Sequence, residues 1–526
     1  EYEIDSLTGS KRHYDDLVGF STFSVTLDEV QTLTATPEGS GFGAQLTQAA
    51  KTGTRGLVDS VRALILGIVM FWPVVLLLAA GATAAHGTAS ASAGATKSKP
   101  NILFILVDDL GWGDLSCQYA ADLRTPNIDA IFETGVRCDN FYANSNVSSP
   151  SRAALMTGRF PAMVGVPGVI RTQPRQSWGY LSPSAVTMPQ MLKRAGYQTA
   201  LVGKWHLGLE SPNLPNERGF DHFQGFLGDM MDDYNTHRRE GHNYMFLNDR
   251  EIDPEGHATD LFATWGAEYI TRQAANDAPF FLYLAFNAPH TPLQPPAEWL
   301  ERVTERDPSL PEKRAKLVAL IEHMDYNVGR VMEALRKSGQ FENTLVVFAS
   351  DNGGDRGAMA NNGPARGAKG DMFEGGLRVP CAVRLPGVCE GGRRNDDFIM
   401  LMDFLPTFCD MLNIPVGHPI DGISVLASLK GEEQDTADRY IFWLRNEGGP
   451  NFCGKTQSAA RYRNHKFLQN MPFEQAQLFD LVSDPLEASP LELKGPAYRD
   501  LHRALTDHYR KWGAVPCQPP VQTDKR

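Results

Sequence analysis

The sequence predicts an α/β fold: a large, mostly parallel central sheet flanked by helices, followed by a smaller C-terminal α+β subdomain. Four short runs rich in Val, Leu, Ile, Phe and Tyr carry this prediction, at 101–107, 198–202, 280–287 and 344–349. Continuous apolar runs of this length are typical of strands buried on both faces of a parallel sheet. Helical patterns alternate with these runs, at 186–195, 259–273 and 313–337. This alternation indicates an α/β class.

The N-terminal part of the chain carries an export signal or a membrane segment. The stretch from Ala63 to Ala80 is uncharged and almost wholly apolar, follows Arg62, and leads into small residues at 82–84. Its length is marginal for crossing a bilayer, and its small-residue exit resembles a signal-peptide cleavage site. We therefore predict a signal peptide over 62–85 and a periplasmic or extracellular protein. Membrane contact is then transient, unless the segment stays as an anchor.

The rest of the chain is predicted to divide into four units, one before this segment and three after it. Residues 1–61 are interpreted as an uncertain or disordered extension, and because the first Met is Met70 we hypothesise a non-standard start near Val58 or Val61. The predicted units that follow are a linker over 86–99, a main unit over 100–420 and a C-terminal subdomain over 421–526. The last is predicted from strand-like patterns at 439–444, 459–468 and 476–482 and a late helix at 498–511.

Composition excludes one class of partner and leaves the redox compartment open. With 62 acidic against 50 basic residues the formal net charge is −12, so there is no basic footprint for nucleic acid. The 7 cysteines form no zinc-ligand pattern, and their odd number leaves at least one outside any intramolecular disulfide.

Chemically active side chains follow each of the four predicted strands. They are Asp108 and Asp109, then Lys204 and His206, then His290, then Asp351 and Asn352. Ligands in open α/β sheets bind beyond the carboxyl ends of the strands, so these four segments are predicted to converge on one pocket. The Asp and Asn side chains are oxygen donors, which suit a hard divalent cation rather than zinc. Either acidic pair alone is more simply a turn former, but two pairs at equivalent strand ends favour a metal site.

The segment 148–158 is predicted to begin a helix at the same pocket. Pro150 suits the first helical position and Gly158 the C′ position. Ser148 would then precede a helix N-terminus, which favours bound anions, and Arg152 would brace an anionic centre from the first turn. The alternative from these residues alone is a well-capped helix without catalytic function.

Six motifs together resemble the sulfatase family of the alkaline phosphatase superfamily. The signature is Ser148-x-Pro-Ser-Arg with a following Leu, Thr and Gly. The supporting motifs occur in the family's order: PNILFILVDDLGWGDL at 100–115, TALVGKWHLG at 199–208, APHTPLQPP at 288–296, SDNGG at 350–354 and GAKGDMFEGGLRVP at 367–380. The resemblance covers roughly 100–500, so the main unit is expected to be a catalytic sulfatase domain.

The resemblance implies a hydrolase of sulfate esters whose nucleophile is formylglycine made from Ser148 by a maturation enzyme. It implies a metal, Ca²⁺ rather than Mg²⁺, held by Asp108, Asp109, Asp351, Asn352 and the modified Ser148. The hydrated aldehyde would attack sulfur. The other implied catalytic residues are Arg152 and Lys204 on the sulfuryl oxygens, His290 and Lys369 on the leaving group, and His206 as the base. Outside these motifs, a lone His or Lys is more often structural.

The substrate is expected to be a sulfated small molecule or glycan, with a sulfated polysaccharide or its oligosaccharides preferred. Its non-sulfate part would be recognised by loops 160–182, 228–257 and 355–366, where Tyr234 and His237 are candidate contacts. Two alternatives remain open. Unmodified Ser148 would suit a phosphoester hydrolase of the same superfamily, and a protein with this fold that binds sulfated glycans without turnover would need no acid/base set.

Overall fold

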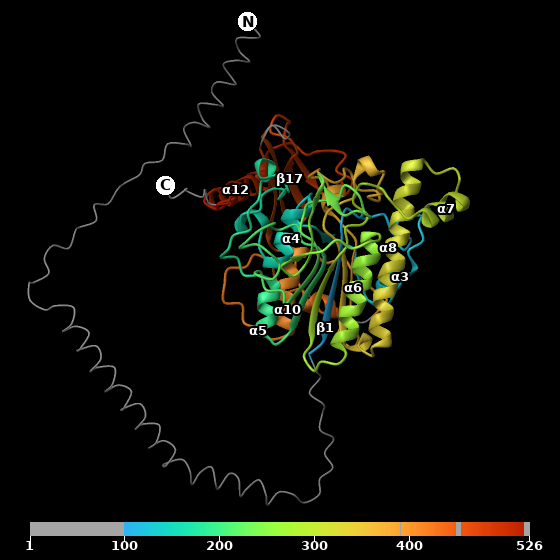
Figure 1. Cartoon of the computed structure of the whole chain (residues 1–526). Coiled ribbons are helices and arrows are strands. Elements are labelled where there is room, and N and C mark those ends of the chain that lie inside the picture. The colour runs from blue at the N-terminus through green and yellow to red at the C-terminus, as the bar shows by residue number, and fades with distance from the viewer. Residues whose placement is uncertain (1–98, 390, 449–453, 520–526) are drawn as a thin grey trace, which may run out of the picture. The chain divides into compact units, whose positions relative to one another are not determined.

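The structure is a computed structural model that describes residues 99–389, 391–448 and 454–519 (Figure 1). Its centre is a ten-stranded sheet. In spatial order the strands are β13 (Arg393–Asn395), β2 (Val136–Cys138), β12 (Cys381–Arg384), β11 (Thr344–Ser350), β1 (Asn101–Val107), β10 (Phe280–Ala285), β4 (Gln198–Lys204), β5 (His222–Phe226), β8 (Met245–Leu247) and β9 (Arg250–Glu251). The predicted fold class is confirmed, and the four predicted apolar strands are β1, β4, β10 and β11.

Smaller sheets complete the strands of the described residues. Two are two-stranded pairs: β3 (Phe141–Tyr142) with β14 (Ile399–Met400), and β6 (Arg238–Arg239) with β7 (His242–Asn243). The third is an antiparallel sheet of β15 (Tyr440–Glu447), β16 (Lys455–Tyr462), β17 (His465–Gln469) and β18 (Gln477–Asp480). The pattern at 459–468 therefore spans the end of β16, a turn and most of β17.

The α-helices of the described residues are α3 (Pro126–Thr134), α4 (Ser148–Thr157), α5 (Met188–Arg194), α6 (Ala258–Gln273), α7 (Ala297–Arg306), α8 (Glu312–Lys337), α9 (Glu374–Leu377), α10 (Phe404–Met411), α11 (Leu426–Lys430) and α12 (Gly495–Trp512). Single 3-10 turns occur at Pro161–Val164, Pro174–Gln176, Phe341–Asn343, Arg356–Ala358 and Leu401–Asp403. Among the described residues, none of the helices combines the length and the apolar character needed to cross a membrane. The predicted segments over 1–61, 62–85 and most of 86–99 lie outside the described residues, and the predicted domain limits stay predictions.

Helices cover both faces of the central sheet, so the sheet has two hydrophobic cores. Figure 1 shows α4, α5 and α10 on one side of β1 and α3, α6 and α8 on the other. Along β1, Ile102 and Phe104 pack into the first core, and Leu103 and Ile105 into the second. Successive side chains of a strand point to opposite faces, which is why an uninterrupted apolar run is needed here.

The parallel register of the central strands places their carboxyl ends at one edge. β1 pairs in parallel with β11 on one side and with β10 on the other, and β10 pairs in parallel with β4. Val107 lies opposite Ser350, so the residues that follow, Asp108 and Asp351, leave the sheet as neighbours. The positions of the predicted polar residues therefore follow from strand pairing.

The C-terminal antiparallel sheet packs against the segment that leads into α4. The Trp443 indole on β15 donates a 2.8 Å hydrogen bond to the Ala143 carbonyl. Trp443 also belongs to a third core with Tyr142 and with Leu501 of α12. The C-terminal sheet therefore packs directly against the segment that leads to Ser148.

Candidate active site

Ser148 lies at the meeting point of the two acidic segments. Its Oγ donates a 2.8 Å hydrogen bond to Oδ1 of Asp108 and lies 3.2 Å from Oδ1 of Asn352. Ser148 is the first residue of α4 and Pro150 the third, so the helix begins two residues before Pro150, where it was predicted to start. Gly158 ends the helix with φ +65°, as predicted. The hydroxyl stands at the positive end of the helix, where an anion is stabilised.

Two fully buried cations, Arg152 on α4 and Lys204 on β4, bind the acidic residues. Arg152 donates from Nε and NH2 to Oδ2 of Asp351, at 3.0 and 2.8 Å. Lys204 donates to Oδ2 of Asp108 at 2.5 Å. Burial alone would raise the pKa of Asp108, but the charges of Lys204 and Arg152 outweigh it and hold that pKa well below its ordinary value. Asp108 is therefore a carboxylate throughout the neutral range.

Lys369 and His290 form the outer part of the site. The Lys369 Nζ donates to Oδ2 of Asp109 at 2.6 Å and lies 3.1 Å from Nε2 of His290. The other ring nitrogen of His290 donates to the Thr291 carbonyl at 2.6 Å, so Nε2 carries the lone pair that faces Lys369. Burial opposes the charge on Lys369, yet Asp109 and Asp108 raise its pKa above the ordinary value. Lys369 is thus a charged proton donor beside a neutral imidazole.

His206 presents an unshared lone pair inside the site. Its Nε2 donates to the Ile170 carbonyl at 2.9 Å, and its buried Nδ1 has no hydrogen-bond partner among the described residues. Burial, with Lys204 and Arg152 nearby, holds its pKa well below the ordinary value, so the ring is neutral. A neutral imidazole with its tautomer fixed in this way is suited to accept a proton.

The oxygen donors fit a hard divalent cation. The Asn352 amide nitrogen donates to Oδ1 of Asp109 at 2.7 Å, and the Asp109 N–H lies 3.3 Å from Oδ1 of Asp351, so the side chains are gathered at one point. Burial, followed by the charges of Asp108 and Asp109, raises the pKa of Asp351 to about 7 despite Arg152. Part of this rise comes from the neighbouring carboxylates, whose negative charge a bound cation would neutralise. The oxygen chemistry favours Ca²⁺ or Mg²⁺ over zinc.

Close backbone approach brings the Asn352 and Lys369 loops together. The Gly353 N–H donates to the Gly376 carbonyl at 3.0 Å, and the Lys369 N–H donates to the Gly354 carbonyl at 3.0 Å. A Cβ at Gly353 would lie 2.0 Å from the Gly375 carbonyl oxygen, so no other residue fits there. The ten predicted site residues are therefore all assembled, although their roles stay predictions.

Sequence reasoning missed Tyr283 as a member of the site. Its hydroxyl lies 3.4 Å from NH1 of Arg152, which also donates to the Lys204 carbonyl. Tyr283 places a hydroxyl within the otherwise apolar run of β10, and this contrast is the sequence signal that could have identified it as a site residue. The predicted substrate contacts Tyr234 and His237 are instead buried and bonded to backbone carbonyls, so neither is presented to a ligand here.

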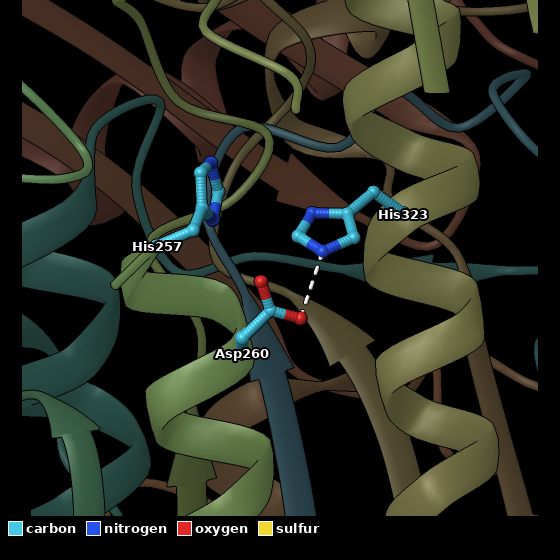
Figure 2. Close-up of side chains that lie close together, drawn as sticks. All are labelled: His257, Asp260 and His323. Atoms are coloured by element: carbon cyan, nitrogen blue, oxygen red, sulfur yellow. Dashed lines mark hydrogen bonds and ion pairs between the residues drawn. The ribbon is translucent and has the colours of Figure 1, made fainter. Parts of the chain in front are cut away.

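A second cluster of potential metal ligands lies between α6 and α8 and is drawn in Figure 2. The His323 Nε2 donates to Oδ1 of Asp260 at 2.9 Å. His257 uses both ring nitrogens: Nε2 donates to the Gln294 carbonyl, and Nδ1 accepts the Thr259 N–H as a helix cap. Only one imidazole lone pair and one carboxylate are left, fewer than a structural zinc requires. This cluster is a polar brace between the two helices.

Comparison with known proteins matches these motifs to a family along most of the chain. The sulfatase family profile matches residues 100–414, and the profile described as N-sulphoglucosamine sulphohydrolase, C-terminal, matches 368–512. A domain of unknown function matches 1–86. These matches cover all ten candidate site residues.

Individual relatives carry the same family name or fold. The dog N-acetylgalactosamine-6-sulfatase is 29% identical over 86% of this chain and 92% of its own, and an uncharacterized Escherichia coli sulfatase, YdeN, is 30% identical over 66% and 69%. The crystal structure of Ps i-CgsB in complex with k-i-k-neocarrahexaose is 30% identical, with a TM-score of 0.73 over 80% of this chain and 95% of that one. Phosphonate monoester hydrolase of Agrobacterium radiobacter, at 21% identity and a TM-score of 0.55, shares the fold.

Proposed function

This chain belongs to the sulfatase family and is a sulfuric ester hydrolase, and from that premise we propose that it removes sulfate from carbohydrates through Ser148. The observation that carries the proposal is the Ser148 hydroxyl, held by Asp108 and Asn352 at the start of α4. Arg152, Lys204 and Lys369 supply the positive charge that a sulfate ester needs in a protein of net charge −12.

Asp108, Asp109, Asp351 and Asn352 would hold Ca²⁺ in preference to Mg²⁺, and the cation together with formylglycine at position 148 would supply a metal-activated hydroxyl for attack on sulfur. A formylglycine-generating maturation enzyme is the implied partner, because Ser148 must lose two hydrogens. Arg152 and Lys204 keep their charges fixed in a water-poor site, where preorganised charge stabilises a transition state most strongly.

Lys369 and His290 would assist the leaving group. Their side chains are 21% and 12% exposed, whereas the Asp108, Arg152 and Lys204 side chains are fully buried. The outer position suits the bond to the leaving oxygen, because the rest of the substrate must extend toward solvent. Lys369 donates the proton or its charge to that oxygen, and His290 Nε2 accepts a hydrogen bond from Lys369 and keeps its ammonium directed inward.

His206 would accept the proton released when sulfate departs. Its Nδ1 has a lone pair, because Nε2 is committed to the Ile170 carbonyl. The lowered pKa keeps the ring unprotonated at neutral pH, which is the state that a base must be in before it acts.

A sulfated glycan is the proposed substrate class. Relatives named for N-acetylgalactosamine 6-sulfate, and the similar structure that holds a neocarrahexaose, support a carbohydrate. A cavity of about 100 Å³ is lined in part by Ile170, Arg171, Tyr180 and Glu210. Arginine, tyrosine and carboxylate side chains are suited to sugar hydroxyl and sulfate groups. The predicted export signal would place the enzyme in the periplasm or outside the cell.

The test combines mass spectrometry with turnover. The chain is produced with and without a serine-type formylglycine-generating enzyme, and the peptide containing Ser148 is weighed. We expect a loss of two hydrogens only with the maturation enzyme, together with Ca²⁺-dependent sulfate release from a nitrophenyl sulfate and from sulfated oligosaccharides. Turnover of phosphate esters by the unmodified chain would instead favour a phosphoester hydrolase, and glycan binding without turnover by the modified chain would favour a binding protein.

A further inference from the structure

Gln457 lies on the C-terminal sheet but contacts two loops, one that leads into Ser148 and one that carries Lys369. It belongs to β16 and is 2% exposed. Its Oε1 accepts a 3.1 Å hydrogen bond from the Asn146 side chain, and its Nε2 donates a 2.8 Å bond to the Gly370 carbonyl. The two loops are also bonded to each other, because the Gly370 N–H donates to the Asn146 carbonyl at 3.0 Å. One amide thus closes a ring of three hydrogen bonds.

We propose that Gln457 is a positioning residue that fixes Lys369 relative to Ser148. The inference rests on the proposed function, in which these two side chains act on one sulfate ester. Asn146 stands two residues before Ser148, and Gly370 directly follows Lys369, so a shift at either end of the amide moves a reacting group. Gly370 has φ +87°, a conformation that its neighbours must hold in place.

At neutral pH, only an amide provides both bonds at this position. Asn146 requires an acceptor and the Gly370 carbonyl requires a donor, and a glutamine side chain offers one of each. A glutamate carboxylate would accept from Asn146 but would face the Gly370 oxygen with a second acceptor. A leucine of similar size would leave both partners unbonded in a buried place, which costs about 1–3 kcal/mol for each.

A displaced Lys369 and a general loss of folded protein can be distinguished by their effects on the rates with different sulfate esters. A displaced Lys369 protonates the leaving oxygen less well, and this matters most for a leaving group that departs poorly as an anion. Nitrophenolate leaves without a proton, whereas phenolate and a sugar alkoxide need one. Loss of folded protein lowers the rate on every sulfate ester by the same factor.

The experiment compares Gln457→Leu and Gln457→Glu with the wild type, using the maturated full chain. Ser458→Ala is the matched control, because Ser458 is the adjacent buried polar residue of β16 and has the opposite orientation along the strand. Lys369→Ala is the reference for loss of the proton donor. The values of kcat and KM are measured on nitrophenyl sulfate and phenyl sulfate, and the melting temperature of each variant is measured alongside.

We expect Gln457→Leu to lower kcat on phenyl sulfate about 10- to 100-fold, with a smaller loss on nitrophenyl sulfate, as in Lys369→Ala. Gln457→Glu should show the same loss at pH 8 and partial recovery at pH 5, because a protonated carboxyl again donates to the Gly370 carbonyl. Equal losses on both esters, or a Gln457→Glu to wild-type ratio that is constant with pH, would overturn the proposal. An inactive maturated wild type would contradict the proposed function instead. If Gln457→Leu does not fold, the Gln457→Glu ratio decides.

Discussion

Lys466 on β17 stands at the centre of a buried charge network with Glu374 and Glu487. Its ammonium is fully buried on β17, 2.8 Å from Oε1 of Glu374 in α9 and 2.9 Å from Oε1 of Glu487. Glu374 also accepts a 2.5 Å hydrogen bond from the Tyr142 hydroxyl. Substitution of Lys466 by Met keeps the length of the side chain and removes its charge, which leaves two carboxylates buried near each other.

The expected loss of folding free energy is about 3–5 kcal/mol, the usual cost of removing one partner from a buried ion pair. Against a total of roughly 5–15 kcal/mol for a folded protein, such a loss is large. Its pH dependence has a definite sign. Burial raises the pKa of Glu487 even with Lys466 present, and without that cation the pKa rises further. A carboxyl with a raised folded-state pKa stabilises the protein below its unfolded-state pKa, and this contribution is lost as pH rises.

Urea unfolding of Lys466→Met at pH 5 and pH 7.5 measures both quantities. The deficit should be smaller at pH 5, and the double variant Lys466→Met with Glu487→Gln should recover part of it at pH 7.5. Lys337→Met is the control, because the Lys337 side chain is 76% exposed on α8 and such pairs contribute little. A deficit below about 1 kcal/mol, or one equal at both pH values, would refute the argument that Lys466 compensates buried charge.

Three further outcomes follow from other parts of the structure. Burial lowers the pKa of His508 to about 4, so the neutral ring contributes its full stability above pH 6.5 and loses it as pH falls toward 4. The variant His508→Phe should therefore lose about 3 kcal/mol less folding free energy than the wild type over this pH range in urea titrations, and an equal loss in the two proteins would contradict this. The variant Gly353→Ala should have a lower melting temperature and no aryl sulfate turnover, because the alanine methyl group would collide with the Gly375 carbonyl oxygen. Wild-type turnover by this variant would contradict the prediction. Added Ca²⁺ should raise the melting temperature of the wild type but not of Asp351→Asn, and equal shifts in the two proteins would place the cation elsewhere.

Much of the site was predictable because strand pairing places it. Asp108 and Asp351 each follow an apolar run, and parallel strands bring such positions to one edge without further information. Lys369 was different: it lies in a glycine-rich loop that no periodicity describes, and only the resemblance to a family singled it out.

Contacts made by the C-terminal sheet were not predictable from the sequence. Gln457 and Lys466 lie in strands whose alternation fixes their direction only after the sheet has docked on the segment before α4. Their partners Asn146 and Glu374 are 311 and 92 positions away. The helix α4 was predicted to start at Pro150, but it begins two residues earlier, at Ser148, because the extended Val147 backbone ends the preceding segment.

The place of β1 in the central sheet has a consequence for the order of events during synthesis. β1 is made first among the described strands, yet it ends up between β10 and β11, and Asp109 meets Asp351 across 242 positions of chain. β10 is the first partner of β1 to be synthesised, and a ribosome adds the residues between Val107 and Phe280 in roughly 9 to 35 s, during which β1 has neither partner strand. The centre of the sheet therefore cannot form before more than half of the chain exists. Such a chain depends on helpers that shield exposed apolar segments, and it is also easily kept extended for passage through a narrow channel.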